Sequence, residues 1–496
     1  MRGIVHLIVC GVLILGCFSE STDGWETPMP DIGSHSSPQL ADITGDGFLD
    51  IILGAGQNEF QPSKHGVFAL DGLSGDTLWT HPCIDQMYGS AVFLDINRDR
   101  TPDALMVGRD KQLYAIDAST GQDIWSYELT SNEYDPLGLT RFNFYNPLLL
   151  EDLDADGVED FMIVNGGNVN AIPGDTINRH PGVLLVMSSA SGDIIVADTM
   201  PDGKESYMTP AIYRDDIGAS HILFGTGGES VTGTLYTVPF DSLIGGSIQS
   251  AEAIYSIDNG HGFIAPPIVS DFTNDGYDDF VILDHGGEVI LFDGQDRTQL
   301  WKVILSDIEL NAQASPGYFN DDDILDLFIN GARGTWPKNT GSYQFFVDGA
   351  SGQIIKEFNV GCAGFASAVS IPSSENSQLS AVLLPVNEYD CRRNNTFYTT
   401  TWLQYFSIDT SYQLLATLEA GKNISSTPWV GDIDDDQQMD IIYVVNTNVR
   451  LIQEFLGMKV KRLETDISWT SEKYWDSYLG PKTNSRFDFQ KSSFDE

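Results

Sequence analysis

Basic residues are scarce in this chain of 496 residues. It has 26 lysines and arginines against 71 aspartates and glutamates, which gives a formal net charge of −45. A surface this acidic repels phosphate backbones and anionic lipids. This argues against nucleic acid and an anionic membrane face as partners. Hydrophobic residues make up 42% of the chain, an ordinary share for a folded protein, so the chain is not a disordered acidic tail.

Catalytic signatures are also missing. The sequence has no G-x-S-x-G, H-E-x-x-H or phosphate-binding loop. Its eight histidines are scattered, so no histidine cluster indicates a transition-metal site. Beyond the first residues, no apolar stretch is long enough to span a bilayer. These absences favour a binding protein over an enzyme.

An acidic loop of the form D-x-[DNT]-x-D-G-x-x-D is what the chain repeats most clearly. In the best copy the predicted ligands are Asp152, Asp154, Asp156 and Asp160. Hard oxygen ligands at this spacing can surround one Ca²⁺, and Gly157 allows the sharp turn between them. The flanking residues read as β-strands, and Ile163 stands where an EF-hand has its glutamate, so the loop joins two strands.

Four further copies keep this pattern. Their predicted calcium ligands are Asp42, Thr44, Asp46 and Asp50; Asp95, Asn97, Asp99 and Asp103; Asp271, Thr273, Asp275 and Asp279; and Asp432, Asp434, Asp436 and Asp440. Arg100 and Gln437 replace the turn glycine, so those two sites are expected to be weak or empty. A worn sixth copy has Tyr318 at the first position and keeps Asn320, Asp322 and Asp326. Metal-free surface turns would explain one copy, but not five that each precede a β-rich apolar run.

A second repeat, A-x-D-x-x-x-G-x-x-x-W, occurs at 69–79 and 115–125 and reads as a β-hairpin. Combined with the acidic loop, it gives four antiparallel strands per unit at a period of about 50–60 residues, the signature of a propeller blade. The prediction is an all-β chain forming a single β-propeller of eight blades. Its inner strands begin near Pro38, Ala91, Pro147, Pro210, Pro267, Pro316, Ala366 and Pro428. Seven blades are the alternative, because the units at 209–257 and 365–418 lack the acidic loop.

The start of the chain reads as a secretory signal over residues 1–17. Ile14-Leu15-Gly16-Cys17 resembles a bacterial lipobox, which implies a lipid on Cys17 as the only membrane anchor. An ordinary signal and a secreted protein are the alternative. A polar tether over 18–30, the propeller over 31–465 and a closing segment with a tail over 466–496 would follow.

Three cysteines lie outside this leader: Cys83, Cys362 and Cys391. An oxidising compartment permits one disulfide among them. The repeat alignment puts Cys362 and Cys391 on the same face, so we predict that these two pair. The alternative is that all three are buried thiols.

The acidic loops resemble the FG-GAP (VCBS-type) repeats of integrin-like propellers. The hairpins resemble the PQQ-like repeats of quinoprotein-type propellers, in which the tryptophan docks on the neighbouring blade. The whole looks like the propeller lipoproteins of bacterial envelopes, which implies the outer membrane of a Gram-negative bacterium. Quinoprotein dehydrogenases carry an adjacent cysteine pair that this chain lacks, so structural Ca²⁺ is the expected cofactor and PQQ is not expected.

We therefore expect a non-catalytic, calcium-stabilised, extracytoplasmic scaffold that binds an envelope protein or a polysaccharide. Its binding face would be built from residues before the inner strands and in the glycine-rich bends. These are His35, Tyr88, Arg109, Asn143, Tyr145, Tyr207, Glu229, His261, His285, Arg333 and Glu388. Each of them also reads as an ordinary hydrogen-bonded loop residue. The alternatives are an accessory lipoprotein in outer-membrane protein assembly and a quinoprotein or carbohydrate-active enzyme.

Overall fold

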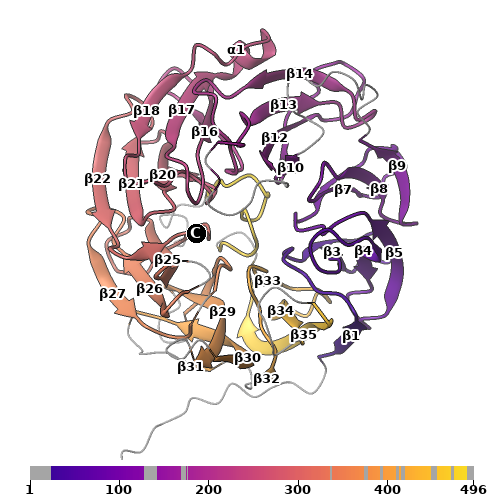
Figure 1. The fold of residues 1–496 in the computed structure, drawn as a ribbon. Helices are drawn as coiled ribbons and strands as arrows, with labels where there is room; N and C mark the ends of the chain where they lie inside the picture. Colours follow the sequence, from indigo (N-terminus) through magenta and orange to yellow (C-terminus); the bar gives the residue numbers. More distant parts are fainter. Residues whose placement is uncertain are drawn as a thin grey trace, which may run out of the picture.

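The computed structural model is a ring of eight antiparallel β-sheets around a central axis (Figure 1). It describes residues 24–127, 142–168, 175, 177–335, 338–362, 364–373, 378–390, 395–408, 413–414, 419–447, 455–470 and 474–488. The predicted all-β propeller is confirmed with eight blades, and the seven-blade alternative is wrong.

The first four blades cover residues 39–256. Blade 1 consists of β2 (Gln39–Ala41), β3 (Asp50–Gly54), β4 (Ser63–Leu70) and β5 (Thr77–Cys83). Blade 2 consists of β6 (Val92–Leu94), β7 (Asp103–Val107), β8 (Leu113–Asp117) and β9 (Gln122–Ser126). Blade 3 consists of β10 (Phe142–Phe144), β11 (Leu148–Leu149), β12 (Phe161–Asn168), β13 (Val183–Met187) and β14 (Ile194–Thr199). Blade 4 consists of β15 (Ala211–Arg214), β16 (Ser220–Gly225), β17 (Thr234–Pro239) and β18 (Glu252–Ser256), with helix α1 (Phe240–Ile244) between the last two.

The other four blades complete the ring. Blade 5 consists of β19 (Ile268–Ser270), β20 (Asp279–Leu283), β21 (Glu288–Asp293) and β22 (Gln299–Ile304). Blade 6 consists of β23 (Ile308–Glu309), β24 (Ser315–Gly317), β25 (Asp326–Arg333), β26 (Gly341–Val347) and β27 (Ile354–Phe358). Blade 7 consists of β28 (Val369–Pro372), β29 (Ser380–Asp390), β30 (Asn395–Phe406), β31 (Gln413–Leu414) and β32 (Glu419–Ala420). Blade 8 consists of β33 (Trp429–Gly431), β34 (Gln438–Asn446), β35 (Gly457–Ser468) and β1 (Glu26–Pro30).

The second strand of each blade is mostly apolar and buried because both faces of a blade pack on neighbours. All five residues of β3, β7 and β20 are buried. The core is therefore divided among the blade interfaces; Ile52 of blade 1 and Met106 of blade 2 lie in one such cluster. Each blade thus depends on its neighbours, as in other repeat proteins.

Ring closure uses both ends of the described chain. Strand β1 pairs antiparallel with β35, from Glu26 opposite Lys461 to Pro30 opposite Gly457. Residues 26–30, which the sequence placed in a tether, are therefore the outer strand of the last blade. Closing the ring in this way pairs the free edge of β35.

The hairpin tryptophans join consecutive blades. Trp79 Nε1 donates a hydrogen bond to the carbonyl oxygen of Ala118 at 2.6 Å, and Trp125 and Trp301 make the same bond to Ser189 and Gly349. The turn glycine of the next blade lies against the indole: a Cβ on Gly121 would be 2.6 Å from the Trp79 ring. Blade-to-blade docking explains why the tryptophan and the glycine recur together.

The C-terminal segment, residues 474–488, crosses the middle of the ring and is the yellow trace inside it in Figure 1. It exchanges backbone hydrogen bonds with the inner strands: Ser370 N donates to Trp475 O, Val430 N to Asp476 O and Val269 N to Ser485 O, each at 2.9 Å. The segment therefore packs on the inner strands of blades 5, 7 and 8.

Several predictions about the ends and cysteines concern residues without a described structure. The signal, Cys17 and Cys391 lie outside the described residues. Cys362 is disulfide-bonded, while Cys83 is a free, buried thiol. The pairing of Cys362 with Cys391 remains a prediction. Within the described ranges, no helix has both the length and the apolarity needed to cross a membrane.

Candidate functional site

The acidic loops share one backbone conformation, held by their own carboxylates. In the third loop, Asp152 accepts hydrogen bonds from the backbone N–H groups of Asp156 at 3.2 Å and Gly157 at 2.8 Å. Asp156 in turn accepts one from Val158 at 2.8 Å. The fourth and fifth loops repeat these bonds from the equivalent positions. The carboxylates thus converge by local turn geometry.

The last aspartate of each loop is buried rather than exposed. Asp160 Oδ2 accepts the N–H of Leu153 at 2.7 Å, and the equivalent atoms of Asp50, Asp103, Asp279 and Asp440 do the same for their loops. Burial raises the pKa of Asp103 and of Asp279 to about 6. A buried carboxylate is costly to ionise without a nearby positive charge.

In the third loop the geometry fits a cation. Asp152, Asp154 and Asp160 each place one carboxylate oxygen within 4.8 Å of the others. Asp160 Oδ1 is buried and has no hydrogen-bond partner among the described residues. Oxygen donors of this kind, with one buried and unsatisfied, suit Ca²⁺. Thr44, Asn97 and Thr273 stand at the third position elsewhere, so those loops would combine two carboxylates with a neutral oxygen before the buried aspartate.

In the fifth loop a protein cation lies among the ligands. Arg462 of β35 is 3% exposed. Its guanidinium donates to Asp440 Oδ1 at 2.9 Å from Nε and to Asp434 Oδ2 at 2.7 Å from an Nη. Two predicted calcium ligands are therefore already paired with a positive charge. Sequence reasoning missed this because Arg462 is 22 residues beyond the loop and reaches it only through the sheet.

Arg100 and Gln437, which replace the turn glycine, adopt its left-handed conformation. Their φ angles are 78° and 67°, against 89° for Gly157. They therefore keep the loop shape at a conformational cost of about 1–2 kcal/mol each. Whether their loops are weak or empty remains a prediction.

In the worn sixth copy, a carboxylate from outside the acidic loop lies beside the loop's own aspartates. Asp348, in the hairpin turn of blade 6, places an oxygen within 4.8 Å of one from Asp322 and one from Asp326. No local pattern signals this contact, because a hairpin aspartate also serves the turn: Asp348 accepts the N–H of Ser351 at 2.7 Å.

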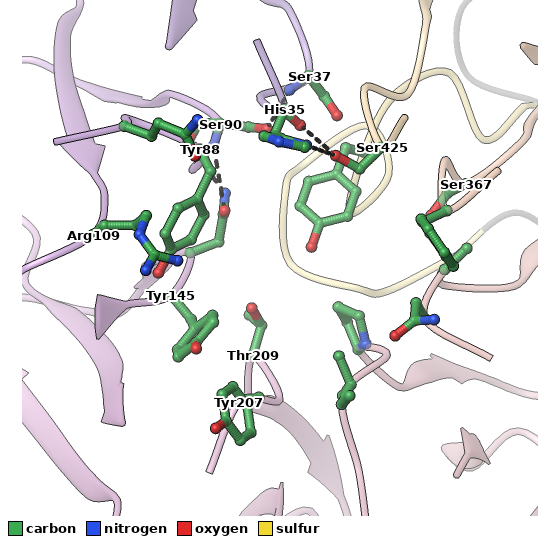
Figure 2. Close-up of a pocket in the computed structure, with 18 of the residues that line it drawn as sticks. His35, Ser37, Tyr88, Ser90, Arg109, Tyr145, Tyr207, Thr209, Ser367 and Ser425 are labelled. Atoms are coloured by element: carbon green, nitrogen blue, oxygen red, sulfur yellow. Dashed lines mark hydrogen bonds between the residues drawn. The ribbon is translucent and has the colours of Figure 1, made fainter. Parts of the chain in front are cut away.

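A cavity lies on the propeller axis, away from the acidic loops. The strands of a blade are antiparallel, so segments before the inner strands lie opposite the loops that follow them. The inner part of the cavity has a volume of about 330 Å³ and adjoins an outer part of about 500 Å³. All eight blades contribute to its wall, and Tyr478 of the C-terminal segment also lines it. Figure 2 shows the side chains directed into this space.

Three tyrosines from consecutive blades form one side of the inner cavity (Figure 2). The ring centroids of Tyr88 and Tyr145 are 5.9 Å apart, and those of Tyr145 and Tyr207 are 5.7 Å apart. Tyr207 Oη donates to Glu205 at 2.8 Å, and Arg179 donates to both residues. These bonds fix the orientation of the aromatic wall.

The charged groups at the cavity are largely paired. Arg109 lies 3.3 Å from Glu59 and 3.6 Å from Asp85, and its guanidinium is over the ring of Phe60. His35 Nδ1 is 2.9 Å from Ser425 Oγ, a contact drawn in Figure 2. Burial, followed by the positive charges of Lys422 and Arg109, lowers the pKa of His35 to about 4. His35 is therefore neutral at physiological pH.

Most residues of the predicted binding face line this cavity. His35, Tyr88, Arg109, Tyr145 and Tyr207 line the inner part, and Glu229 and His285 line the outer part. Asn143, His261, Arg333 and Glu388 are not among the lining residues. Sequence reasoning missed Asn146, Asn311, Phe365 and Tyr478. The first three lie just before inner strands, so the same rule, applied to more residues, would have included them.

The fold and these two features define an eight-bladed β-propeller with acidic loops at one end of its inner strands and a polar, aromatic cavity at the other. A model of the FAM234A/B beta-propeller family matches residues 55–246. Mouse Protein FAM234B is 26% identical over 370 residues, which cover 66% of this chain and 53% of the mouse protein. Human Protein FAM234B is 25% identical over 366 residues, with the same coverage. The chain thus spans about half the length of these relatives.

Solved structures show the same fold at low sequence identity. A europium-containing methanol dehydrogenase has a TM-score of 0.58 at 10% identity and covers 88% of this chain and 92% of its own. The quinohemoprotein alcohol dehydrogenase from Comamonas testosteroni has a TM-score of 0.55 at 10% identity, covering 90% and 78%. Identities this low support the fold alone.

The relatives correct two predictions. The chain was expected to be a bacterial envelope lipoprotein with FG-GAP/VCBS-type repeats, but its matches are FAM234 proteins of animals. That identification is wrong, and so is the location as a Gram-negative outer-membrane lipoprotein. A four-residue motif after an apolar leader carries little information about lineage, whereas similarity over 370 residues carries much more. The alternative role as an accessory lipoprotein in outer-membrane protein assembly depended on that location and is therefore not supported.

Proposed function

We propose that this propeller is a non-catalytic binding scaffold, stabilised by calcium in its acidic loops, whose axial cavity binds a protein or glycan partner. The observation that carries the proposal is the convergence of loops from all eight blades on one cavity lined by tyrosine, amide and hydroxyl groups. Pockets with a few placed polar groups among aromatic side chains are the usual form of binding sites.

Calcium would act on stability and not in the cavity. The third loop offers three carboxylates and one unsatisfied buried oxygen, which fit a hard divalent cation. Binding only to the folded ring contributes about 1.4 kcal/mol per site at ten times the dissociation constant. Several such sites would matter to a domain whose net stability is on the order of 5–15 kcal/mol.

The charges at the cavity support binding over catalysis. Glu59 is the carboxylate that lines the inner cavity, and it is paired with Arg109 at 3.3 Å. Carboxylate-based hydrolysis of glycosides uses two carboxyl groups on either side of the bond to be cleaved. Turnover of oligosaccharides, or of alcohols with PQQ and Ca²⁺, by the purified chain would overturn this part of the proposal.

The test uses the full chain as bait for cell extracts and for a glycan array, in Ca²⁺ and in EDTA. A cavity variant, Asn311→Ala with Tyr145→Ala, is compared with a surface control, Asn359→Ala with Ile217→Ala. We expect a partner that wild type and control retain and the cavity variant binds at least about tenfold more weakly. Partners that bind the folded cavity variant as tightly as wild type would overturn the cavity assignment. Binding and stability both unaffected by EDTA would overturn the calcium part.

A further inference from the structure

The inner cavity differs from its surroundings in charge and in chemistry. The chain carries a formal net charge of −45, whereas the inner wall presents chiefly hydroxyl, amide and aromatic groups. The chemistry of this wall indicates what kind of ligand it would select. The argument rests on the proposed function, because it names the ligand of the same cavity.

Anions are disfavoured by the molecule as a whole. The net charge creates a negative potential around the ring that lowers the local concentration of anionic ligands. Arg109 is the arginine in the inner wall, and Glu59 and Asp85 lie within 3.3 Å and 3.6 Å of it. An anionic ligand would have to displace these carboxylates to form a bidentate pair with the guanidinium.

Cations are disfavoured locally. Arg109 lines the same cavity as His35. The buried Lys422 lies 5.9 Å from the ring of Phe455, which packs on His35 at 5.1 Å. A ligand cation beside His35 would be repelled by both positive charges. In the inner wall the carboxylate of Glu59 is paired with Arg109 at 3.3 Å. Glu205, bonded to Tyr207, is paired with Arg179 at 3.0 Å.

An uncharged ligand meets neither obstacle and finds complementary groups. Tyr88, Tyr145 and Tyr207 present ring faces and edges at half-buried positions, which suit the C–H face of a saturated ring. Asn311 and Thr209 line the same space with amide and hydroxyl groups that can donate to and accept from ligand hydroxyls. A volume of about 330 Å³ admits a small molecule and excludes a folded domain.

We propose that the axial cavity binds an uncharged, hydroxyl-rich ring, namely a neutral saccharide, against the Tyr88–Tyr145–Tyr207 wall with Asn311 opposite. The same chemistry is presented by a free monosaccharide and by the end of a neutral glycan. In this complex the tyrosine rings pack on the C–H face, and the amide of Asn311 bonds a ring hydroxyl. The C-terminal segment also lines this space through Tyr478.

The test measures saccharide binding to the full chain in about 1 mM Ca²⁺. Probes are methyl glycosides of neutral hexoses and N-acetylhexosamines, short neutral oligosaccharides, and the matching uronic acids and amino sugars. Saturation-transfer NMR detects binding and calorimetry measures it. We expect at least one neutral saccharide to bind, with its charged counterparts at least about tenfold weaker. A methyl glycoside that binds indicates a free sugar, and binding by oligosaccharides alone indicates a glycan end; both support the proposal.

Variants locate the binding. Asn311→Ala and Tyr145→Ala, tested separately, should each weaken the affinity at least about tenfold, whereas Asn359→Ala, an exposed asparagine, should leave it unchanged. Tighter binding of the uronic acid or amino sugar, or full affinity in both folded cavity variants, would overturn the proposal. A protein partner lost by the cavity variant, with no saccharide bound, would overturn this inference and leave the proposed function standing.

Discussion

At the scale of single residues, the acidic loops differ in how their carboxylates are partnered. The third loop leaves Asp160 Oδ1 buried and unsatisfied, whereas the fifth loop directs Asp434 and Asp440 at the guanidinium of Arg462. A buried carboxylate is costly to keep ionised without a positive partner, and in the fifth loop the chain supplies one where ring closure occurs. The strand carrying Arg462 is the one that pairs with the N-terminal strand β1.

Replacing Arg462 by methionine should therefore destabilise the protein strongly in EDTA. It removes the partner of two carboxylates, one of them buried, at a cost of about 3–5 kcal/mol. Adding Ca²⁺ should recover part of the loss, because the vacated carboxylates can then bind the metal. Urea unfolding at both conditions measures this. Lys482→Met, which breaks the exposed pair with Asp488, is the control and should cost less than about 1 kcal/mol. Equal losses in the two variants would contradict the role assigned to Arg462.

At the scale of elements, the hairpin of each blade serves as a docking surface for the tryptophan before it. Gly121 has a φ of 72° and lies against the Trp79 indole, which explains why the repeat keeps glycine there. In blade 5 Arg297 replaces this glycine and adopts the same left-handed conformation, with a φ of 65°. The preceding strand, β18, has no tryptophan to accommodate.

A matched pair of glycine substitutions separates two reasons for glycine in the turn: the left-handed backbone and the space for the indole ring. Gly203→Ala meets open space at a φ of 68°, so it should cost only the backbone strain of about 1–2 kcal/mol. Gly121→Ala adds a clash with the Trp79 ring and should cost clearly more. In a Trp79→Ala background the two substitutions should cost the same, since the clash is then gone. Chemical denaturation of the two parents and their variants gives the four substitution costs; an unchanged difference between them in the Trp79→Ala background would refute the docking explanation.

The strands show which parts of the fold could be predicted from the sequence. Periodicity and turn residues located the eight inner strands within a few residues, because each blade is a local unit of consecutive hairpins. Contacts between distant segments were missed because they do not depend on consecutive residues. Neither Arg462 in the fifth loop nor Tyr478 in the cavity carries a local signal, since both reach their sites only after the ring has closed. The cavity followed from the rule that residues before inner strands face the axis.

At the scale of the whole molecule, the ring concentrates carboxylates and buries some of them, such as Asp103 and Asp279, hydrogen-bonded but without a positively charged partner among the described residues. Burial raises the pKa of Asp103 and Asp279 to about 6, above the value of about 3.9 for a free aspartate. The folded state thus binds these protons more tightly than the unfolded state. Their contribution to stability is fully present below about pH 4 and is lost as the pH rises through about 6.

In EDTA the free energy of unfolding should therefore fall between about pH 4.5 and pH 7.5. Ca²⁺ binds the ionised carboxylates, so its stabilising effect should grow over the same interval and oppose the fall. Asp103→Asn mimics the protonated form and should flatten the EDTA profile. Thermal unfolding across this pH range, with and without Ca²⁺, makes the comparison. A profile in EDTA that rises with pH would show that these carboxylates are stabilised in the ionised form instead.

The claim on which the rest of the account depends is that the acidic loops bind calcium in the folded ring. The most direct measurement is the midpoint of thermal unfolding of the full chain at neutral pH, in EDTA and in Ca²⁺ from micromolar to millimolar concentration. We predict a midpoint that rises with Ca²⁺ concentration, and a smaller rise in the Asp154→Asn variant of the third loop. A midpoint unchanged by EDTA or Ca²⁺, in a chain shown to be metal-free, would contradict the account.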